Sequence, residues 1–96
     1  METYLICYDI NKERGGAAYA AANKRLTNRI REMFSVYWHH LDSTWVVQTN
    51  LNAAQIRDDL KGYIDGNDEL LVVKSGRPAA WIGFNDRASS WLKARL

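Results

Sequence analysis

The sequence predicts an α+β fold with the element order β-α-β-β-α-β, and three observations support this. Short runs rich in β-branched and aromatic residues recur along the chain, two stretches between them repeat apolar residues at steps of three and four, and turn-forming residues separate these segments. At 96 residues the chain is long enough for one ordinary core. We therefore expect a single domain over residues 1–96, with its core at about 3–75 and a C-terminal extension at 76–96.

The N-terminal third predicts one strand and one helix. The run "TYLICYDI" ends at the polar, glycine-bearing stretch "NKERGG", which predicts a strand at residues 3–9 followed by a loop. From Tyr19 to Phe34, apolar residues recur at helical spacing and mark one buried stripe of a helix. The opposite side of this helix is rich in lysine and arginine.

A hairpin follows the first helix. Two apolar strands are predicted at about residues 36–41 and 44–49. Asp42 and Ser43 lie between them, and their short polar side chains suit a tight turn.

The second helix and fourth strand complete the core. "NAAQ" at residues 52–55 is a capping box, and apolar residues then repeat at helical spacing as far as Ile64. "DGND" ends this helix, and "ELLVVK" at residues 69–74 predicts a fourth strand. Right-handed crossovers then give a four-stranded antiparallel sheet with both helices on one face, which is the ferredoxin-like arrangement.

The C-terminal extension is predicted to end in a short helix. After Pro78 comes the apolar segment "AAWIGF", and Asn85 is a suitable cap for a helix running from about Asp86 to Leu96. A helix of about eleven residues is marginal alone in water. It must therefore dock, either on its own sheet or on a partner subunit.

Aromatic residues raise a question about the sheet face that the two core helices leave open. Trp38, Trp45 and Trp81 lie in predicted strands. Such a face either stacks bases, as RNA-recognition motifs do, or is covered by a second subunit. Because the aromatic signature of RNA-recognition motifs is absent, we favour a dimer that buries these tryptophans.

Composition places the chain among ordinary globular proteins. Hydrophobic residues make up 47% and charged residues 25%, and the net charge of +2 is too small to indicate nucleic-acid binding by itself. The single cysteine, Cys7, lies in an apolar run and fits a reducing compartment. With no signal peptide and no apolar run of membrane-spanning length, we expect a cytoplasmic protein with no membrane contact.

The predicted topology gathers polar residues at one end of the sheet. Asp9 ends the first strand, and the antiparallel neighbours of that strand begin beside it. The polar residues expected at this rim are His39, His40, Asp42, Ser43, Thr44, Asn67, Asp68 and Glu69. Carboxylates and imidazoles of this kind suit magnesium or manganese, although no recognised metal-binding spacing is present.

Each rim residue also has a plainer interpretation. His39 and His40 are adjacent on a strand and point to opposite faces, so at most one is expected in any given pocket. Asp42 and Ser43 are also simple turn formers, and a serine-histidine-aspartate triad rarely forms within one hairpin. Asp9 is either an acceptor for loop amides or a functional carboxylate.

Basic residues cluster in and before the first helix. They are Lys12, Arg14, Lys24, Arg25, Arg29 and Arg31. The plain interpretation is a solvated helix face, but Arg25 and Arg29 lie one turn apart with no acidic residue between them. This unrelieved charge favours an anionic partner.

The segments "YLICYDINK", "YWHHLDSTW", "STWVVQTNLNAAQIRDDL" and "IDGNDELLVV" carry a family resemblance over most of residues 3–82. The chain resembles the superfamily of CRISPR-associated protein 2 and virulence-associated protein D, and within it a group of small bacterial proteins labelled SinR-family. Two features depart from the superfamily: the polar segment "HHLDST", and a terminal helix after "RPAAWIGF" where a further strand often pairs with the partner subunit.

The resemblance implies a homodimer in which the aspartates that end the first strands face each other and hold a divalent metal for phosphodiester cleavage. Asp9 matches that position. Our leading hypothesis is therefore a metal-dependent endonuclease acting on RNA or DNA, with magnesium or manganese at Asp9. His39 or His40 would act as general acid or base, oriented by Asp42 and Ser43. The predicted phosphate-binding residues are Lys12, Arg14, Lys24, Arg25 and Arg29. The alternative is a non-catalytic dimer that binds nucleic acid or protein.

Overall fold

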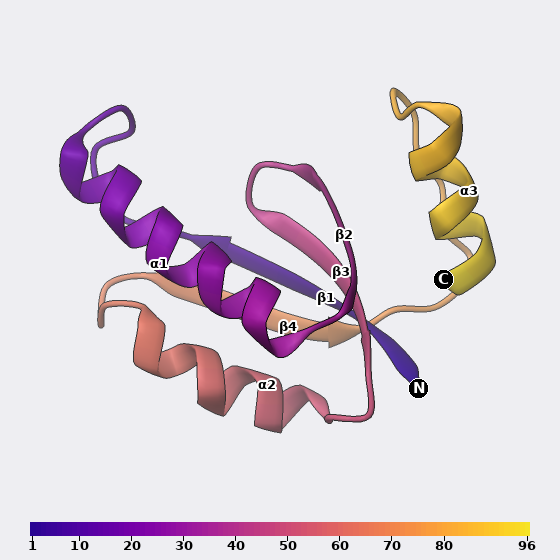
Figure 1. Ribbon diagram of the computed structural model, residues 1–96, viewed down its shortest axis with the longest axis horizontal. Coiled ribbons are helices and arrows are strands. Elements are labelled where there is room, and N and C mark those ends of the chain that lie inside the picture. The colour runs from indigo at the N-terminus through magenta and orange to yellow at the C-terminus, as the bar shows by residue number, and fades with distance from the viewer.

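The computed structural model describes all of residues 1–96 and has the predicted order of elements. The elements are β1 (Glu2–Asp9), α1 (Ala17–Met33), β2 (Val36–Leu41), β3 (Thr44–Thr49), α2 (Ala53–Leu60), the 3₁₀ turn η1 (Lys61–Tyr63), β4 (Glu69–Lys74) and α3 (Asp86–Arg95). The sheet order is β2-β3-β1-β4, and each neighbouring pair is antiparallel. The α+β, ferredoxin-like prediction with a C-terminal helix is confirmed (Figure 1).

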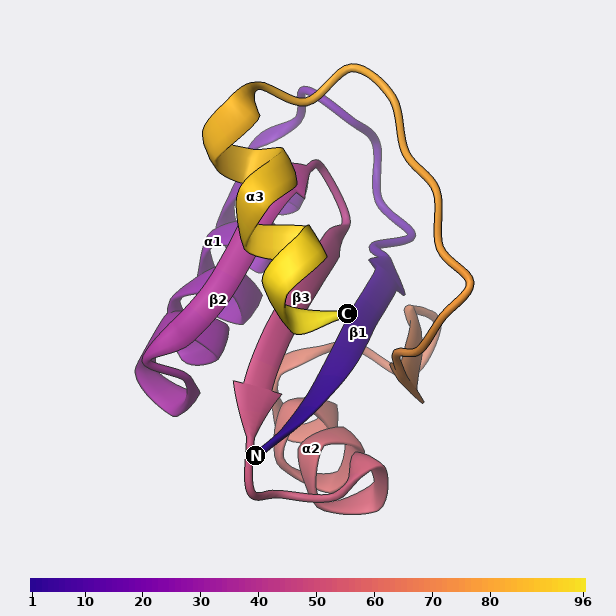
Figure 2. The ribbon, with the colours of Figure 1, turned by 90° about the vertical axis from the view of Figure 1, so that its right-hand side faces the viewer.

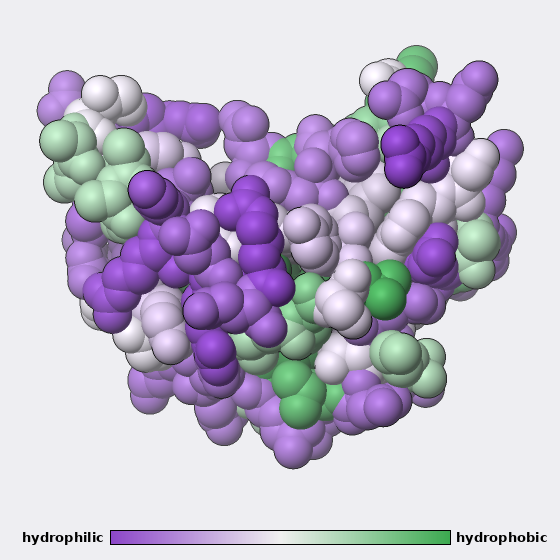
Figure 3. Space-filling model, in the orientation of Figure 1, coloured by the Kyte–Doolittle hydropathy of each residue, from purple (hydrophilic) through white to green (hydrophobic).

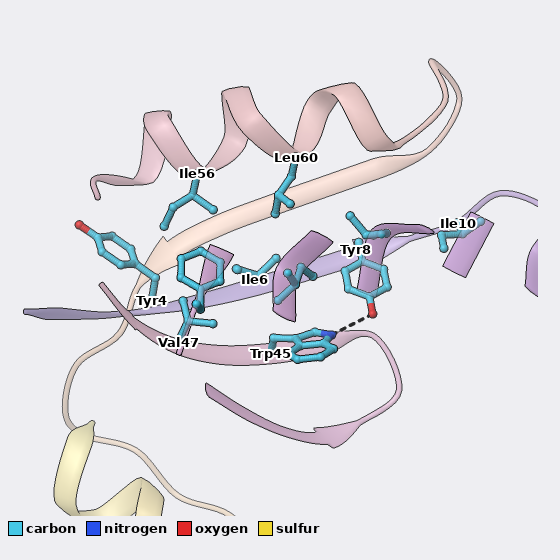
Figure 4. Packing of buried hydrophobic residues seen from close by; sticks show 11 residues of the cluster. Tyr4, Ile6, Tyr8, Ile10, Trp45, Val47, Ile56 and Leu60 are labelled. Atoms are coloured by element: carbon cyan, nitrogen blue, oxygen red, sulfur yellow. Dashed lines mark hydrogen bonds between the residues drawn. The ribbon is translucent and has the colours of Figure 1, made fainter. Parts of the chain in front are cut away.

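The main core lies between the sheet and the layer of α1 and α2. Trp45 of β3 is fully buried in it, and its indole Nε1 donates a 3.0 Å hydrogen bond to the Tyr8 hydroxyl of β1 (Figure 4). Burial raises the pKa of Tyr8, which keeps its hydroxyl neutral. The tryptophan therefore fills the core without leaving its polar atom unpaired.

A second core lies on the other face of the sheet, under α3 (Figure 2). Trp38 of β2 and Val46 of β3 pack there against Ala88 and Leu92 of α3. The Trp38 indole donates to the backbone oxygen of Ala88 at 3.3 Å. Of the two docking alternatives, the terminal helix thus takes its own sheet, and Asn85 caps it by accepting from the Ala88 amide at 2.8 Å.

The structure corrects the assignment of the tryptophans. Trp45 belongs to the helix-side core and Trp38 is covered by α3, so neither is free to be buried by a second subunit. Trp81 lies in the loop between β4 and α3, not in a strand. Alternation along the strands places Trp38 and Trp45 on opposite faces, and a helix whose docking site could not be predicted covers one of those faces. The homodimer itself remains a prediction.

Helix boundaries differ from the predictions by a few residues. α1 begins at Ala17 instead of Tyr19, because alanines are strong helix formers that an apolar spacing does not count. α2 ends at Leu60, and a 3₁₀ turn containing Gly62 carries the chain on toward Ile64. A tighter turn is common at the end of a helix. None of the three helices combines the length and the apolar character that crossing a membrane requires.

Candidate functional site

The predicted polar rim forms at the end of the sheet where β1 finishes. Asp9 is exposed and lies opposite Glu69 in the β1–β4 register. The β2–β3 turn is held beside this end by a 3.1 Å hydrogen bond from the Tyr8 amide to the Ser43 backbone oxygen. Asp68 accepts hydrogen bonds from two backbone amides, those of Asn11 and Asp65, each at 2.9 Å. Asp68 therefore orders the loops at this end of the sheet.

The carboxylates of the rim allow a limited fit to a divalent cation. No group of three or more histidine, cysteine, aspartate or glutamate side chains lies together in a way that could hold a metal. Asp9 and Glu69, however, are exposed and lie directly opposite each other on the adjacent strands β1 and β4. Magnesium often binds through one or two carboxylates and completes its shell with water and substrate phosphates. Two opposed carboxylates match the protein's share of such a site, and no third histidine, cysteine, aspartate or glutamate side chain is grouped with them.

A larger hollow opens between β2 and α3, and we call it the β2–α3 cleft. It has a volume of about 570 Å³ and is lined by Arg31, Tyr37, Trp38, His39, His40, Asn85, Arg87, Ala88 and Trp91. Four of these residues are consecutive on β2, which is an outer strand of the sheet. Because consecutive strand residues face opposite ways, a cleft that contacts all four runs along the outer edge of β2. Figure 3 shows the surface hollowed above the β2–β3 hairpin, between the two arms that carry α1 and α3.

This position corrects the prediction that at most one of the two histidines faces any given pocket. His39 and His40 do lie on opposite faces: His39 stacks on Trp45 in the helix-side layer, and the His40 ring lies 5.0 Å from the Trp38 ring on the α3 side. Both nevertheless line the same cleft. The cleft straddles an outer strand, so it reaches the side chains of both faces around the strand's free edge.

The electrostatic character of the β2–α3 cleft is cationic. No carboxylate lines it, whereas Arg31 of α1 and Arg87 of α3 do. Neither arginine takes part in any of the six ion pairs of the protein. Both side chains are exposed. Their charges therefore remain available to an anion in the cleft.

Buried aromatic rings hold the polar groups of the cleft in place. The His39 ring stacks on Trp45 with centroids 3.9 Å apart and planes 9° apart, and the Arg31 guanidinium lies 5.3 Å from the centre of the same indole. Stacking and cation–π contacts of this kind restrict the side chains on a fixed platform. The fully buried Trp45 thus connects the main core to one wall of the cleft.

Most of the basic residues predicted to bind phosphate have partners within the protein. Arg29 donates through Nε and Nη2 to both carboxylate oxygens of Asp59 in α2, each at 2.8 Å. Lys12 forms an ion pair with Asp65, and Arg25 donates to the Gly62 backbone oxygen at 2.8 Å. The charge that looked unrelieved along α1 is relieved by α2 and the loop that follows it. Lys24 is exposed, and its ammonium makes no polar contact within the protein.

The remaining predicted residues, in the hairpin, do not form a nucleophile triad. Asp42 forms an exposed ion pair with Arg14 at 3.1 Å. The His39 ring nitrogen Nε2 lies 3.3 Å from the backbone oxygen of Asp42, not from its carboxylate. Ser43 occupies the turn, and its backbone oxygen accepts from the Tyr8 amide. The hairpin thus contributes histidines and one balanced ion pair to the site.

Sequence reasoning did not place Arg87, Trp91 or Tyr37 in the site. Arg87 and Trp91 are four residues apart in α3, so they share one face of the helix, and this spacing was the available signal. What could not be read from the chain was which surface that face would meet. Comparison with protein-family models, with curated proteins and with solved structures gives no match to this chain.

Proposed function

We propose that this protein binds nucleic acid in the β2–α3 cleft. The observation that supports this is the pairing of two unpartnered arginines, Arg31 and Arg87, with aromatic walls in a hollow that contains no carboxylate. Guanidinium groups match phosphate geometry, and aromatic rings stack on bases. A volume of about 570 Å³ is within the size range of pockets that hold small molecules.

Substitution of the two cleft arginines tests this proposal. We expect Arg31→Gln combined with Arg87→Gln to weaken binding of a fluorescently labelled oligonucleotide at least about tenfold. The slope of log affinity against log salt should also fall by about 0.7 for each phosphate that the protein no longer neutralises. Lys61→Gln combined with Lys93→Gln is a matched control, because it also removes two exposed positive charges, whose ammonium groups make no polar contact and lie outside the cleft. Equal affinities in all three proteins would contradict the proposal.

A second candidate function is metal-dependent cleavage of phosphodiester bonds at the rim, which the opposed carboxylates of Asp9 and Glu69 support. These two side chains would hold Mg²⁺ or Mn²⁺, which supplies charge neutralisation for a phosphate and an activated water. The family resemblance adds an Asp9 from a second subunit. His39 or His40, which line hollows at the neighbouring hairpin, would act in its protonated form as a general acid and donate a proton to the departing oxygen.

The cleavage candidate has its own test. We expect Asp9→Asn to abolish metal-dependent cutting of single- and double-stranded RNA and DNA while leaving oligonucleotide binding in the cleft intact. Chelator should act in the same way on the wild type. If wild type and Asp9→Asn cut equally, or if neither cuts with either metal, the rim is not a catalytic site and the binding function stands alone.

A further inference from the structure

We infer that the ligand is a single strand several nucleotides long, which crosses the outer edge of β2 from the β2–α3 cleft into a second hollow beside α1. The inference rests on the proposed function and names its ligand class. The second hollow, which we call the hairpin hollow, has a volume of about 340 Å³. Its walls include Arg14, Tyr19 and Asp42 together with the same two histidines, His39 and His40.

The two hollows are neighbours on the surface, because two histidines line both of them. A chain in contact with the rings of His39 and His40 therefore reaches either side without leaving the surface. Each hollow pairs an arginine with an aromatic ring. Arg87 and Trp91 supply them in the cleft, and the Arg14 guanidinium lies 5.5 Å from the centre of the Tyr19 ring in the hairpin hollow. Alternating charge and rings match the alternation of phosphates and bases along a strand.

The aromatic walls favour a single strand over a duplex. In a duplex the bases are stacked inside and cannot lie against protein rings, whereas unpaired bases can be splayed onto them. The half-buried rings of His39, Trp91 and Tyr19 are spread along the path from α3 to α1. RNA and DNA share this stacking and phosphate chemistry, so the inference covers both.

Asp42 is the one carboxylate that lines either hollow, so its charge should oppose the binding of a strand there. Its ion pair with Arg14 measures 3.1 Å, and the two side chains are 83% and 69% exposed. A phosphate entering the hairpin hollow must compete with Asp42 for Arg14 and is repelled by the carboxylate. Removal of the Asp42 charge should therefore tighten the binding of a strand long enough to reach this hollow and leave a dinucleotide held in the cleft unaffected.

The experiment measures equilibrium binding of oligo-uridine and oligo-thymidine strands, from a dinucleotide up to about sixteen nucleotides, with a duplex and a poly-glutamate peptide as competitors. We expect affinity to rise with length, Asp42→Asn to tighten the longer strands about threefold or more, and Arg14→Gln to weaken them by a similar factor. Neither variant should change dinucleotide affinity. Both residues are exposed, and circular dichroism verifies that the variants fold.

The outcomes separate the inference from the proposed function. If strands bind and depend on Arg31 and Arg87 but not on length, Arg14 or Asp42, the nucleic-acid function stands and the path over β2 is wrong. Duplex binding as tight as that of a single strand also overturns the inference. If no nucleic acid binds, or if the acidic peptide binds equally well, both the inference and the proposed function fail.

Discussion

At the scale of single residues, the basic side chains in and before α1 differ in whether they have an acidic partner within the protein. Arg29 holds α1 to α2 through a two-pronged contact with Asp59, and the adjacent guanidinium holds the pKa of that carboxyl below its usual range. The Lys12 ammonium lowers the pKa of Asp65 in the same way. Arg31 has no such partner and lies over Trp45 beside the cleft. Position relative to α2 therefore decides which arginines stabilise the fold and which remain free for a ligand.

The Asp59 contact predicts a pH-dependent contribution to stability. Because the pKa of Asp59 is lowered in the folded protein, its contribution is complete above its ordinary value of 3.8 and is lost as pH falls through the lowered pKa. We expect Asp59→Asn to reduce the free energy of unfolding at neutral pH, and the gap to the wild type to close at acid pH. Urea denaturation at a series of pH values measures both.

A neighbouring aspartate provides the control for this measurement. Asp58 forms an ion pair with Arg57 at 2.9 Å, but both side chains are at least 60% exposed. Exposed pairs of this kind contribute little to stability, so Asp58→Asn should match the wild type at all pH values. A gap between Asp59→Asn and the wild type that stays constant down to acid pH would show that Asp59 acts through packing and not through its charge.

At the scale of elements, local patterns predicted most of the fold. The hairpin strands and β4 have the predicted bounds, because apolar runs between turn residues leave little freedom in register. The rim around Asp9 was also predictable, since strand order alone brings those ends together. The β2–α3 cleft was not, because it depends on where α3 docks. That docking is set by the long-range contacts of Trp38 with Ala88 and Leu92, which no local pattern encodes.

The docking of α3 is testable through Leu92, which is 3% exposed against Trp38 and Val46. Truncation of a well-packed leucine to alanine removes about 2–5 kcal/mol of packing. Because α3 is held to the sheet by the small second core and by no strand pairing, we expect Leu92→Ala to release this helix while β1, β3 and β4 stay folded. Hydrogen exchange should show reduced protection confined to α3, and oligonucleotide affinity should fall because Arg87 and Trp91 leave the cleft.

An exposed leucine-sized residue serves as the matched control for Leu92. Ile82 is 94% exposed, so Ile82→Ala should alter neither exchange in α3 nor affinity. Exchange that accelerates throughout the sheet in Leu92→Ala would mean that α3 is an integral part of one cooperative unit and not a separately docked helix.

At the scale of the whole molecule, the two outer strands of the sheet differ in how far neighbouring elements cover them. Beside β2, charged and aromatic side chains from α1 and α3 line a cleft. β4 has no such cover: Leu71 is 59% and Val73 44% exposed, and no strand pairs with its outer edge. An unpaired strand with exposed apolar residues is a common place for subunits to meet. This surface is where we expect the predicted homodimer to form.

The homodimer prediction is checked by sedimentation velocity over a range of protein concentrations. We expect the wild type to sediment as a dimer and Leu71→Lys to shift it toward the monomer, because the substitution places a charge in the apolar contact. Ile82→Lys introduces the same charge on an exposed loop residue and should leave the dimer intact. A wild type that stays monomeric at every concentration would contradict the prediction.

The residues that line the β2–α3 cleft also affect how readily the protein aggregates at high concentration. The outer edge of β2 carries unpaired backbone groups, which in a bare strand would template the addition of other chains. Arg31, Arg87 and the paired histidines surround that edge with charge and bulk. The side chains that would bind phosphate therefore also oppose the addition of other chains to this edge. We expect the variant that lacks both cleft arginines to be less soluble as well as weaker in oligonucleotide binding.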